Sequence, residues 1–207
     1  MIKWAEDNIA EENENGELFI IMWALDSDKF RHKILEERGY IKQLDWYEYQ
    51  NINYLEESHV DAELPSGFKY VSMKDGIDWR DKCRVQQLAF NSKISSDMEE
   101  PTLDDSIYYN KELDLFTAND HKLTSFCTVW VDSNNKLAKI EPVGTHPDYR
   151  RRSLGRCVIE EGLRRAKKLG AEVAYVDAGG ENREAFYKSA GFLPLDINRP
   201  WFKYIKK

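Results

Sequence analysis

Hydrophobic spacing in the last third of the chain switches repeatedly between the period of a strand and the period of a helix. The predicted elements are a strand at 137–145, a helix at 154–169, a strand at 172–178 and a helix at 181–190. Gly170 and Gly191 follow the two helices, where glycine commonly closes a helix. Two short strands, 192–195 and 201–205, are expected to end the chain, with a turn at 198–200. This order predicts a mixed α/β domain.

The segment before residue 137 continues the mixed pattern. The predicted elements are a strand at 67–73, a helix at 79–90, and a hairpin of strands 113–118 and 124–132 that turns at Asn119-Asp120. Val85, Leu88 and Ala89 share one side of the predicted helix and are expected to face inward. The polar, acidic segment 95–110 is interpreted as a helical or irregular stretch that lines a cleft.

The first 60 residues repeat the pattern of the chain's end. The predicted elements are a helix at 2–14, a strand at 17–25, a helix at 28–38 closed by Gly39, and a strand at 45–51. Residues 34–40 align with residues 186–192, which suggests an internal repeat, although any strand, helix and closing glycine look alike. We therefore expect a partial half-domain at 1–60 and a complete domain at 64–207, joined by a linker at 56–65.

Composition narrows the class of protein. With 207 residues, 42% of them hydrophobic, the chain can bury a core and form one large or two small domains. The net charge of -7 argues against non-specific nucleic-acid binding, which depends on a basic surface. Three cysteines and four histidines lack the spacing of a disulfide framework or a metal site. The acidic N-terminus and the short longest apolar run, 18–25, predict neither a signal peptide nor a membrane span, so we expect a soluble cytoplasmic protein.

Residues 141–155 carry the most informative chemistry. This segment contains the end of an apolar strand, then Arg150, Arg151 and Arg152, and then the start of an amphipathic helix. The N-terminus of a helix presents unpaired N–H groups and the positive end of the helix dipole, which together favour an anion. The pattern is typical of a phosphate site, and its alternative is a solvated surface turn.

The segments 147–156 and 185–192 (Ala-Phe-Tyr-Lys-Ser-Ala-Gly-Phe) together resemble the GNAT superfamily of acyl-CoA-dependent N-acyltransferases. The first resembles the family's Arg/Gln-x-x-Gly-x-Gly/Ala pyrophosphate loop, with Arg150 leading and Gly155 closing. The resemblance extends from about residue 67 to the C-terminus. It implies a mostly antiparallel sheet with a splayed central parallel pair of strands, flanked by helices, and acetyl-CoA as cosubstrate.

The same resemblance implies which residues contact the coenzyme. The loop would hold the pyrophosphate through Arg150, Arg151, Arg152, Ser153, Leu154, Gly155 and Arg156. Val143 and Thr145 would offer backbone groups to the pantetheine arm, Asn182 would contact that arm, and Tyr187 would lie by the sulfur. Ser153 departs from the family, which usually has glycine there, so we expect weakened or reshaped coenzyme binding.

Attack of an amine on a thioester requires a neutral amine, donors for the oxyanion and a proton for the thiolate. Tyr187 is the candidate acid, and its alternative role is to pack a helix on the sheet. Glu141 is the candidate base, acting directly or through water, unless it merely faces solvent. His146 is a second candidate base or a structural residue. Tyr108 and Tyr109 would shape the acceptor pocket or pack on it.

The N-terminal copy lacks a pyrophosphate loop. In the repeat alignment Phe30 replaces Asn182 and Leu35 replaces Tyr187, so this copy is expected to be non-catalytic. A half-domain leaves a sheet edge and an apolar face uncovered. We therefore expect residues 1–60 to pack on the other domain or on a second chain, as in a homodimer.

The leading hypothesis is an N-acetyltransferase that joins acetyl-CoA and a primary amine in a ternary complex, without a covalent enzyme intermediate. The acidic surface favours cationic amines as acceptors. A non-catalytic acyl-CoA sensor or interaction module is the alternative. An unrelated phosphate-binding α/β domain is disfavoured because the chain lacks a Gly-x-x-x-x-Gly-Lys loop. We expect no metal, nucleic acid or membrane as partner.

Overall fold

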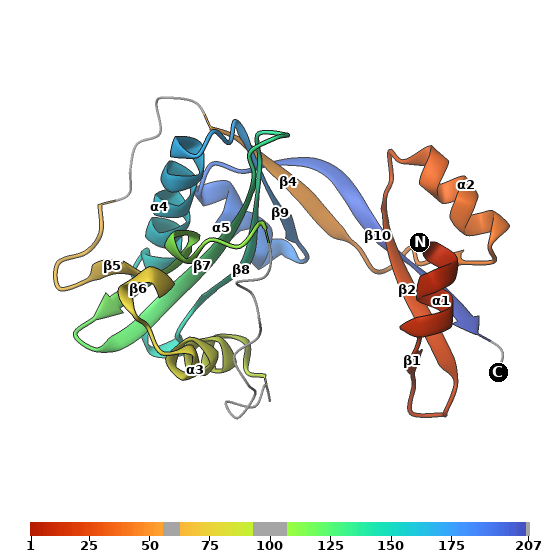
Figure 1. Ribbon diagram of the computed structural model, residues 1–207, viewed down its shortest axis with the longest axis horizontal. Coiled ribbons are helices and arrows are strands. Elements are labelled where there is room, and N and C mark those ends of the chain that lie inside the picture. Colours follow the sequence, from red (N-terminus) through yellow and green to blue (C-terminus); the bar gives the residue numbers. More distant parts are fainter. Residues whose placement is uncertain (56–62, 93–106, 206–207) are drawn as a thin grey trace. The chain divides into compact units, whose positions relative to one another are not determined.

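A computed structural model describes residues 1–55, 63–92 and 107–205 (Figure 1). The chain forms two compact units, and each is described by itself. Unit 1 comprises Met1–Asn51, Asp177–Glu184 and Pro194–Lys207. Unit 2 comprises Ile52–Val176 and Ala185–Leu193. Within the described residues, no helix combines the length and the apolar character that crossing a membrane requires.

Unit 2 is built on a mixed sheet with strand order β4-β9-β8-β7-β6-β5. These strands are β4 (Glu48–Tyr54), β5 (Lys69–Ser72), β6 (Asp114–Asn119), β7 (Lys122–Asp132), β8 (Leu137–Thr145) and β9 (Val173–Ala178). Strands β5 to β8 pair antiparallel, whereas β8 and β9 pair in parallel. The predicted fold class, a mixed sheet with a parallel pair among antiparallel strands, is therefore confirmed.

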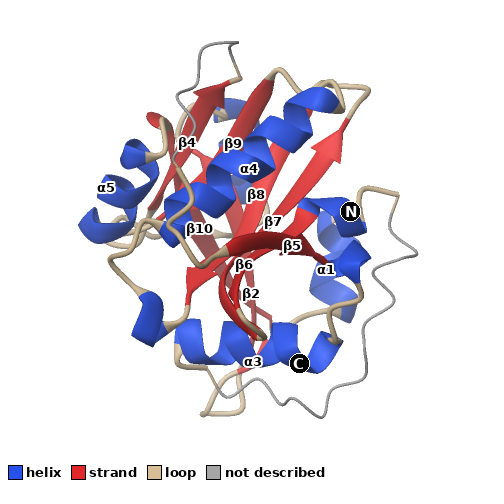
Figure 2. Cartoon of the chain, turned by 90° about the vertical axis from the view of Figure 1, so that its left-hand side faces the viewer, coloured by secondary structure: helices blue, strands red, loops and turns tan. Residues whose placement is uncertain are grey.

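Two helices cover opposite faces of this sheet. Neighbouring residues of β7 point to opposite faces, so each face presents apolar side chains on which one helix packs. Helix α3 (Trp79–Phe90) packs against Phe126, with Met73, Val85 and Phe116 in the same core cluster. Helix α4 (Leu154–Lys168) packs on the other face, where a Cβ on Gly162 would lie 2.8 Å from Cγ2 of Val129. Figure 2 shows α4 lying across the strands.

Among its described residues, unit 2 also contains three short 3-10 helices and the last residues of α5. They are η1 (Met73–Asp75), η3 (Lys111–Leu113), η4 (Pro147–Tyr149) and α5 (Glu181–Ser189), whose last residues belong to this unit. Gly191 follows α5 with φ of 84°, a left-handed conformation that glycine adopts without strain. The predicted bounds of β8 and α3 are confirmed residue for residue.

Unit 1 pairs the two ends of the chain. Its elements are α1 (Ile2–Asn8), β1 (Glu11–Glu12), β2 (Leu18–Leu25), α2 (Lys29–Glu37), β3 (Ile41–Lys42) and β10 (Leu193–Ile205). Strand β10 pairs antiparallel with β2 from Asn198↔Leu25 to Ile205↔Leu18. Its core cluster comprises Ala5, Ile20, Ala24, Leu35, Tyr40 and Trp201. The C-terminal strand thus completes the N-terminal unit, while the predicted half-domain at 1–60 and its pairing with a second chain stay predictions.

Several predicted elements are wrong in their extent. The two strands predicted at 192–195 and 201–205 form one strand, β10, which begins at Leu193, because pairing with β2 outweighs the turn preference of residues 198–200. The predicted helix 2–14 stops at Asn8, since Glu12 pairs with Leu18 across a turn.

Two further expectations are wrong in detail. The hairpin turns at Asp120-His121, because Asn119 pairs with Lys122 and Asp120 takes a φ of 50°. Leu88, expected to face inward, is 43% exposed. Most of the segment 95–110 and of the linker 56–65 lies outside the described residues.

Candidate functional site

Strands β8 and β9 separate part-way along their length. Their parallel pairing comprises Leu137↔Val173, Ala138↔Ala174 and Lys139↔Tyr175, and within the described residues it extends no further. Strand β8 nevertheless continues to Thr145 and remains paired with β7 on its other side. One edge of residues 141–145 is thus left outside the strand pairing, and such an edge can bind an extended ligand through its backbone groups.

The loop after β8 reaches α4 through two left-handed residues. Arg151 has φ of 63° and Ser153 has φ of 60°. Ser153 is the N-cap residue of α4, and its side chain makes no capping hydrogen bond. The first intrahelical bond is donated by the Cys157 N–H to the Ser153 carbonyl, so the preceding N–H groups of the first turn have no intrahelical partner. N–H groups of this kind at a helix start can bind an anion.

Gly155 allows α4 to begin close against two other elements. A Cβ at this position would lie 2.9 Å from Oγ1 of Thr145 and 3.1 Å from Cζ of Phe186. The neighbouring Leu154 is 1% exposed, and its carbonyl accepts a hydrogen bond of 3.1 Å from Oγ of Ser125. The helix start is therefore held tightly between β7, the end of β8 and α5.

The arginines of the loop have different partners. Arg150 donates from Nη2 to the Ala89 carbonyl at 2.8 Å and from Nε to the Thr145 carbonyl at 3.3 Å, so it ties the end of α3 to the loop. The guanidinium of Arg152 lies 5.3 Å from the centre of the Tyr149 ring. Arg156 pairs with Glu160 at 2.6 Å. For Arg151 the described part of the chain provides no side-chain partner.

Tyr187 is a buried residue of α5. It is 8% exposed, and its ring centre lies 5.2 Å from that of Phe186 and 5.9 Å from that of Phe192. Its carbonyl accepts hydrogen bonds from the N–H groups of Ala190 and Phe192, which close the helix. Asn182 lies in the same helix, but its side chain is outside the described residues.

The two candidate bases lie in different places. The Glu141 side chain is 66% exposed, with Oε2 3.2 Å from Nζ of Lys139, and its carbonyl accepts a hydrogen bond from Nε1 of Trp130 at 2.7 Å. His146 follows the end of β8, and its Nδ1 accepts a hydrogen bond of 3.2 Å from the Asp148 N–H, which caps η4. Glu141 therefore lies beside the gap between the strands, whereas His146 lies at the start of the loop.

Sequence reasoning missed a buried ion pair on the α3 side of the sheet. Lys82 and Asp114 pair through Nζ and Oδ2, with side chains only 4% and 0% exposed. The Tyr109 and Thr128 hydroxyls each donate to Asp114 at 2.8 Å, and the Lys82 ammonium lies 5.0 Å from the centre of the Trp79 ring. No spacing rule marks these residues, because a lysine within a helix and an aspartate at the start of a strand are usually solvated.

Comparison with known proteins identifies the family of this chain. The acetyltransferase (GNAT) family model matches residues 79–192, which is more than half of the chain. Over 82 residues the chain is 30% identical to an uncharacterised N-acetyltransferase of Methanocaldococcus jannaschii, covering 38% of this chain and 36% of that protein. The chain thus spans about a third of that relative's length.

Solved structures agree in fold at low sequence identity. A GCN5-related N-acetyltransferase from Sphaerobacter thermophilus aligns with a TM-score of 0.69 at 16% identity, over 92% of this chain and 61% of that one. A tandem GNAT protein from the clavulanic acid biosynthesis pathway aligns with a TM-score of 0.65 at 12% identity, over 91% and 65%. These alignments show the shared fold, and the match to the family model over residues 79–192 shows that the chain belongs to the acetyltransferase (GNAT) family.

Proposed function

We propose that this protein transfers an acetyl group from acetyl-CoA to a primary amine, which attacks the thioester directly in a ternary complex. One observation carries the proposal. Strand β8 has one edge outside the strand pairing at residues 141–145, and the loop that follows it leads to the N–H groups at the start of α4, which have no intrahelical partner. A long acyl-CoA needs both features, since its arm is an extended amide chain and its pyrophosphate is an anion. Family membership supports the same activity.

Backbone groups and arginines share the binding of the coenzyme in this proposal. Val143 and Thr145 pair with the pantetheine arm, and Asn182 contacts it. The N–H groups of residues 153–156 face the pyrophosphate, aided by the charges of Arg151 and Arg152. Arg150 acts by holding the loop against α3, because its guanidinium is bonded to two carbonyls.

The transfer step needs three proton movements. The Glu141 carboxylate, which is accessible to solvent, takes one proton from the ammonium form of the acceptor, directly or through water. The neutral nitrogen then bonds to the acyl carbon as the carbon–sulfur bond breaks, and Tyr187 donates a proton to the departing thiolate. The nitrogen loses its second proton to the Tyr187 oxygen, which leaves the amide and restores the phenol. His146 is the second candidate for the base. Burial raises the pKa of the Cys127 thiol, which argues against Cys127 as a thiolate nucleophile that would carry the acetyl group.

The acceptor is proposed to be a cationic amine, since the net charge of -7 favours the approach of cations. Polyamines, aminoglycosides and lysine side chains fit this class. The ring centre of Tyr109 lies 5.8 Å from that of Trp130, whose Nε1 is bonded to the Glu141 carbonyl. Tyr109 is thereby linked to the strand that carries the proposed base, and with Tyr108 it is proposed to shape the acceptor pocket.

Calorimetric titration with acetyl-CoA tests the coenzyme site. Replacing Arg151 and Arg152 by alanine together should raise the Kd at least about tenfold, since each lost bond between charged groups costs more than about 1 kcal/mol. Joint replacement of Lys167 and Lys168 by alanine is the matched control, because it removes two positive charges from the other end of α4. Failure of the parent protein to bind, or an equal effect of the control, would overturn the coenzyme site.

Thiol release from acetyl-CoA, measured with a panel of primary amines, tests the chemistry. Tyr187→Phe and Glu141→Gln should lower kcat and leave the Kd of acetyl-CoA unchanged. A second function, non-catalytic acyl-CoA binding, is favoured by the enclosure of Tyr187 between two rings and by the ion pair of Glu141 with Lys139. Coenzyme binding with no acetylation of any amine would support that second function.

A further inference from the structure

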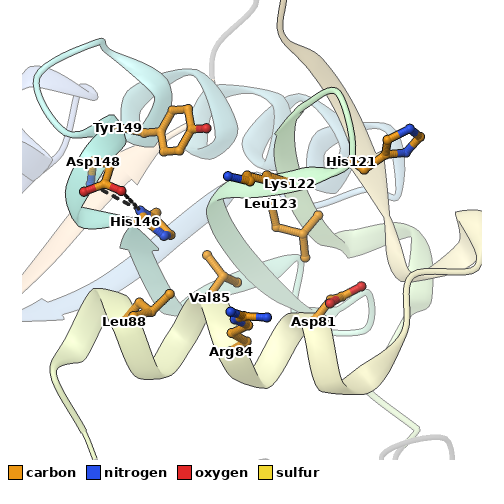
Figure 3. Close-up of a pocket in the computed structure, with 10 residues that line it drawn as sticks. All are labelled: Asp81, Arg84, Val85, Leu88, His121, Lys122, Leu123, His146, Asp148 and Tyr149. Atoms are coloured by element: carbon orange, nitrogen blue, oxygen red, sulfur yellow. Dashed lines mark hydrogen bonds and ion pairs between the residues drawn. The ribbon is translucent and has the colours of Figure 1, made fainter.

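A pocket of about 280 Å³ lies on unit 2, where α3, the turn before β7 and η4 meet (Figure 3). None of the residues proposed to contact the coenzyme lines it. The pocket is nevertheless adjacent in sequence to the proposed coenzyme loop, since η4 ends at the pocket residue Tyr149 and the loop begins with Arg150. The pocket has the size of a small molecule of amino-acid dimensions.

Two cations from different elements face the pocket. Arg84 lies on α3 and Lys122 begins β7. Figure 3 shows the amino end of Lys122 and the hydroxyl of Tyr149 directed into the space above α3, with the Arg84 guanidinium on the α3 side. Neither cation has an ion-pair partner in the described part of the chain. A planar guanidinium with a second positive charge is suited to binding a carboxylate.

A negative side chain lies one helical turn from Arg84. Asp81 is exposed on α3, lines the same pocket, and has no ion-pair partner among the described residues. Side chains three positions apart in a helix are neighbours at about 5–6 Å between Cβ atoms. Asp81 and Arg84 therefore present opposite charges at a separation that suits the two ends of an amino acid.

The floor of the pocket is apolar. Val85 is buried, and Leu88 is 43% exposed on the face that the helical pattern assigns to the core. Leu123 of β7 lines the pocket from the other side. An exposed leucine between charged groups is suited to the hydrocarbon part of a ligand. A bare inorganic ion would leave this floor without a partner.

We infer that this pocket binds a small zwitterion, a free amino acid with an aliphatic side chain. Its carboxylate contacts Arg84 and Lys122, its ammonium contacts Asp81, and its side chain rests on Val85 and Leu88. The site goes beyond the transfer reaction. His146, the second candidate for the base, also lines the pocket, but binding of the amino acid requires neither the coenzyme nor Glu141.

Calorimetry on the whole protein without coenzyme tests this site. The probes are L-alanine, L-valine, L-leucine and L-methionine, and at least one should bind with a stoichiometry of one. For the tightest of them, the N-acetyl derivative and the carboxamide should each bind at least about tenfold more weakly, since each loses one charged contact. If the N-acetyl derivative binds equally well, the pocket is a plain anion site and the inference is wrong.

Two variants localise the binding. Arg84→Gln should weaken the probe at least about tenfold, whereas Arg80→Gln, which removes the same charge from an exposed position of α3, should not change its affinity. Asp81→Asn should weaken the amino acid but not its N-acetyl derivative. Binding by none of the four amino acids, or an equal loss in Arg84→Gln and Arg80→Gln, would overturn the inference.

Discussion

Replacing Lys82 by methionine should destabilise unit 2 more than almost any other conservative change in the chain. The substitution keeps the length of the side chain and removes its charge from a site that is 4% exposed. Asp114, with a fully buried side chain, is then left as a charge without a counter-ion. Solvent cannot screen or replace the lost partner, because neither side chain reaches water.

The size of the loss follows from the remaining partners of Asp114. Breaking a buried ion pair by removing one member costs about 3–5 kcal/mol. Asp114 keeps hydrogen bonds from the Tyr109 and Thr128 hydroxyls, both at 2.8 Å, which hold the carboxylate in place. We therefore expect a loss near the lower end, about 3 kcal/mol, including the contact of the ammonium with the Trp79 ring.

A double-mutant cycle measures the interaction free energy between Lys82 and Asp114 apart from their other contacts. Asp114→Asn alone should cost a similar amount, because it leaves the Lys82 ammonium buried beside a neutral amide. The double variant has no buried charge, so it should recover about 2 kcal/mol relative to the sum of the two single variants. Urea unfolding followed by circular dichroism gives each free energy from the midpoint at constant m. Additive losses, or a cost below about 1 kcal/mol for Lys82→Met, would refute the reasoning.

Four further outcomes are expected. Ser153→Gly should stabilise the protein by about 1 kcal/mol by relieving a left-handed φ of 60°, and should tighten acetyl-CoA binding; an unchanged Tm and Kd would contradict this. Gly162→Ala should cost about 1–3 kcal/mol in urea unfolding through its contact on β7, without altering that Kd. Cys127, fully buried, should react with a thiol reagent at neutral pH only after unfolding. The hydrogen bond from Arg38 lowers the pKa of Glu6 from 4.5 to about 2. The stabilisation of unit 1 by ionised Glu6 should therefore be complete above pH 4.5 and should vanish as the pH falls towards 2. Glu6→Gln should abolish this pH dependence of the urea midpoint.

Local signals explain which elements were predictable. The bounds of α3 follow from an aspartate that caps its first turn, Asp78, and from an apolar face at helical spacing. The end of α5 follows from Gly191, which adopts the left-handed conformation that closes a helix. In both cases the determining residues lie within a few positions of the element itself.

Long-range pairing explains the largest errors. Residues 198–200 have the composition of a turn, yet they continue β10 because their backbone pairs with residues 23–25 of β2. Those partners are far away in sequence, so no window of neighbouring residues contains the signal. The early end of α1 has a local cause instead, because the following strand β1 pairs with β2 through Glu12↔Leu18, only six residues apart.

The loop at the start of α4 shows both kinds of information within a few residues. Its backbone was predictable, since the family pattern has glycine where Ser153 takes a left-handed φ, a conformation that glycine adopts without cost. The roles of the arginines were not, because the Arg150 guanidinium bonds the Ala89 carbonyl on a helix that lies 61 residues earlier in the chain. Spacing alone treats neighbouring arginines as equivalent. In the folded protein the Arg150 guanidinium is instead hydrogen-bonded to two backbone carbonyls. Arg151 and Arg152 are therefore the charges available to an anion, and their joint replacement is the sharper test of the coenzyme site.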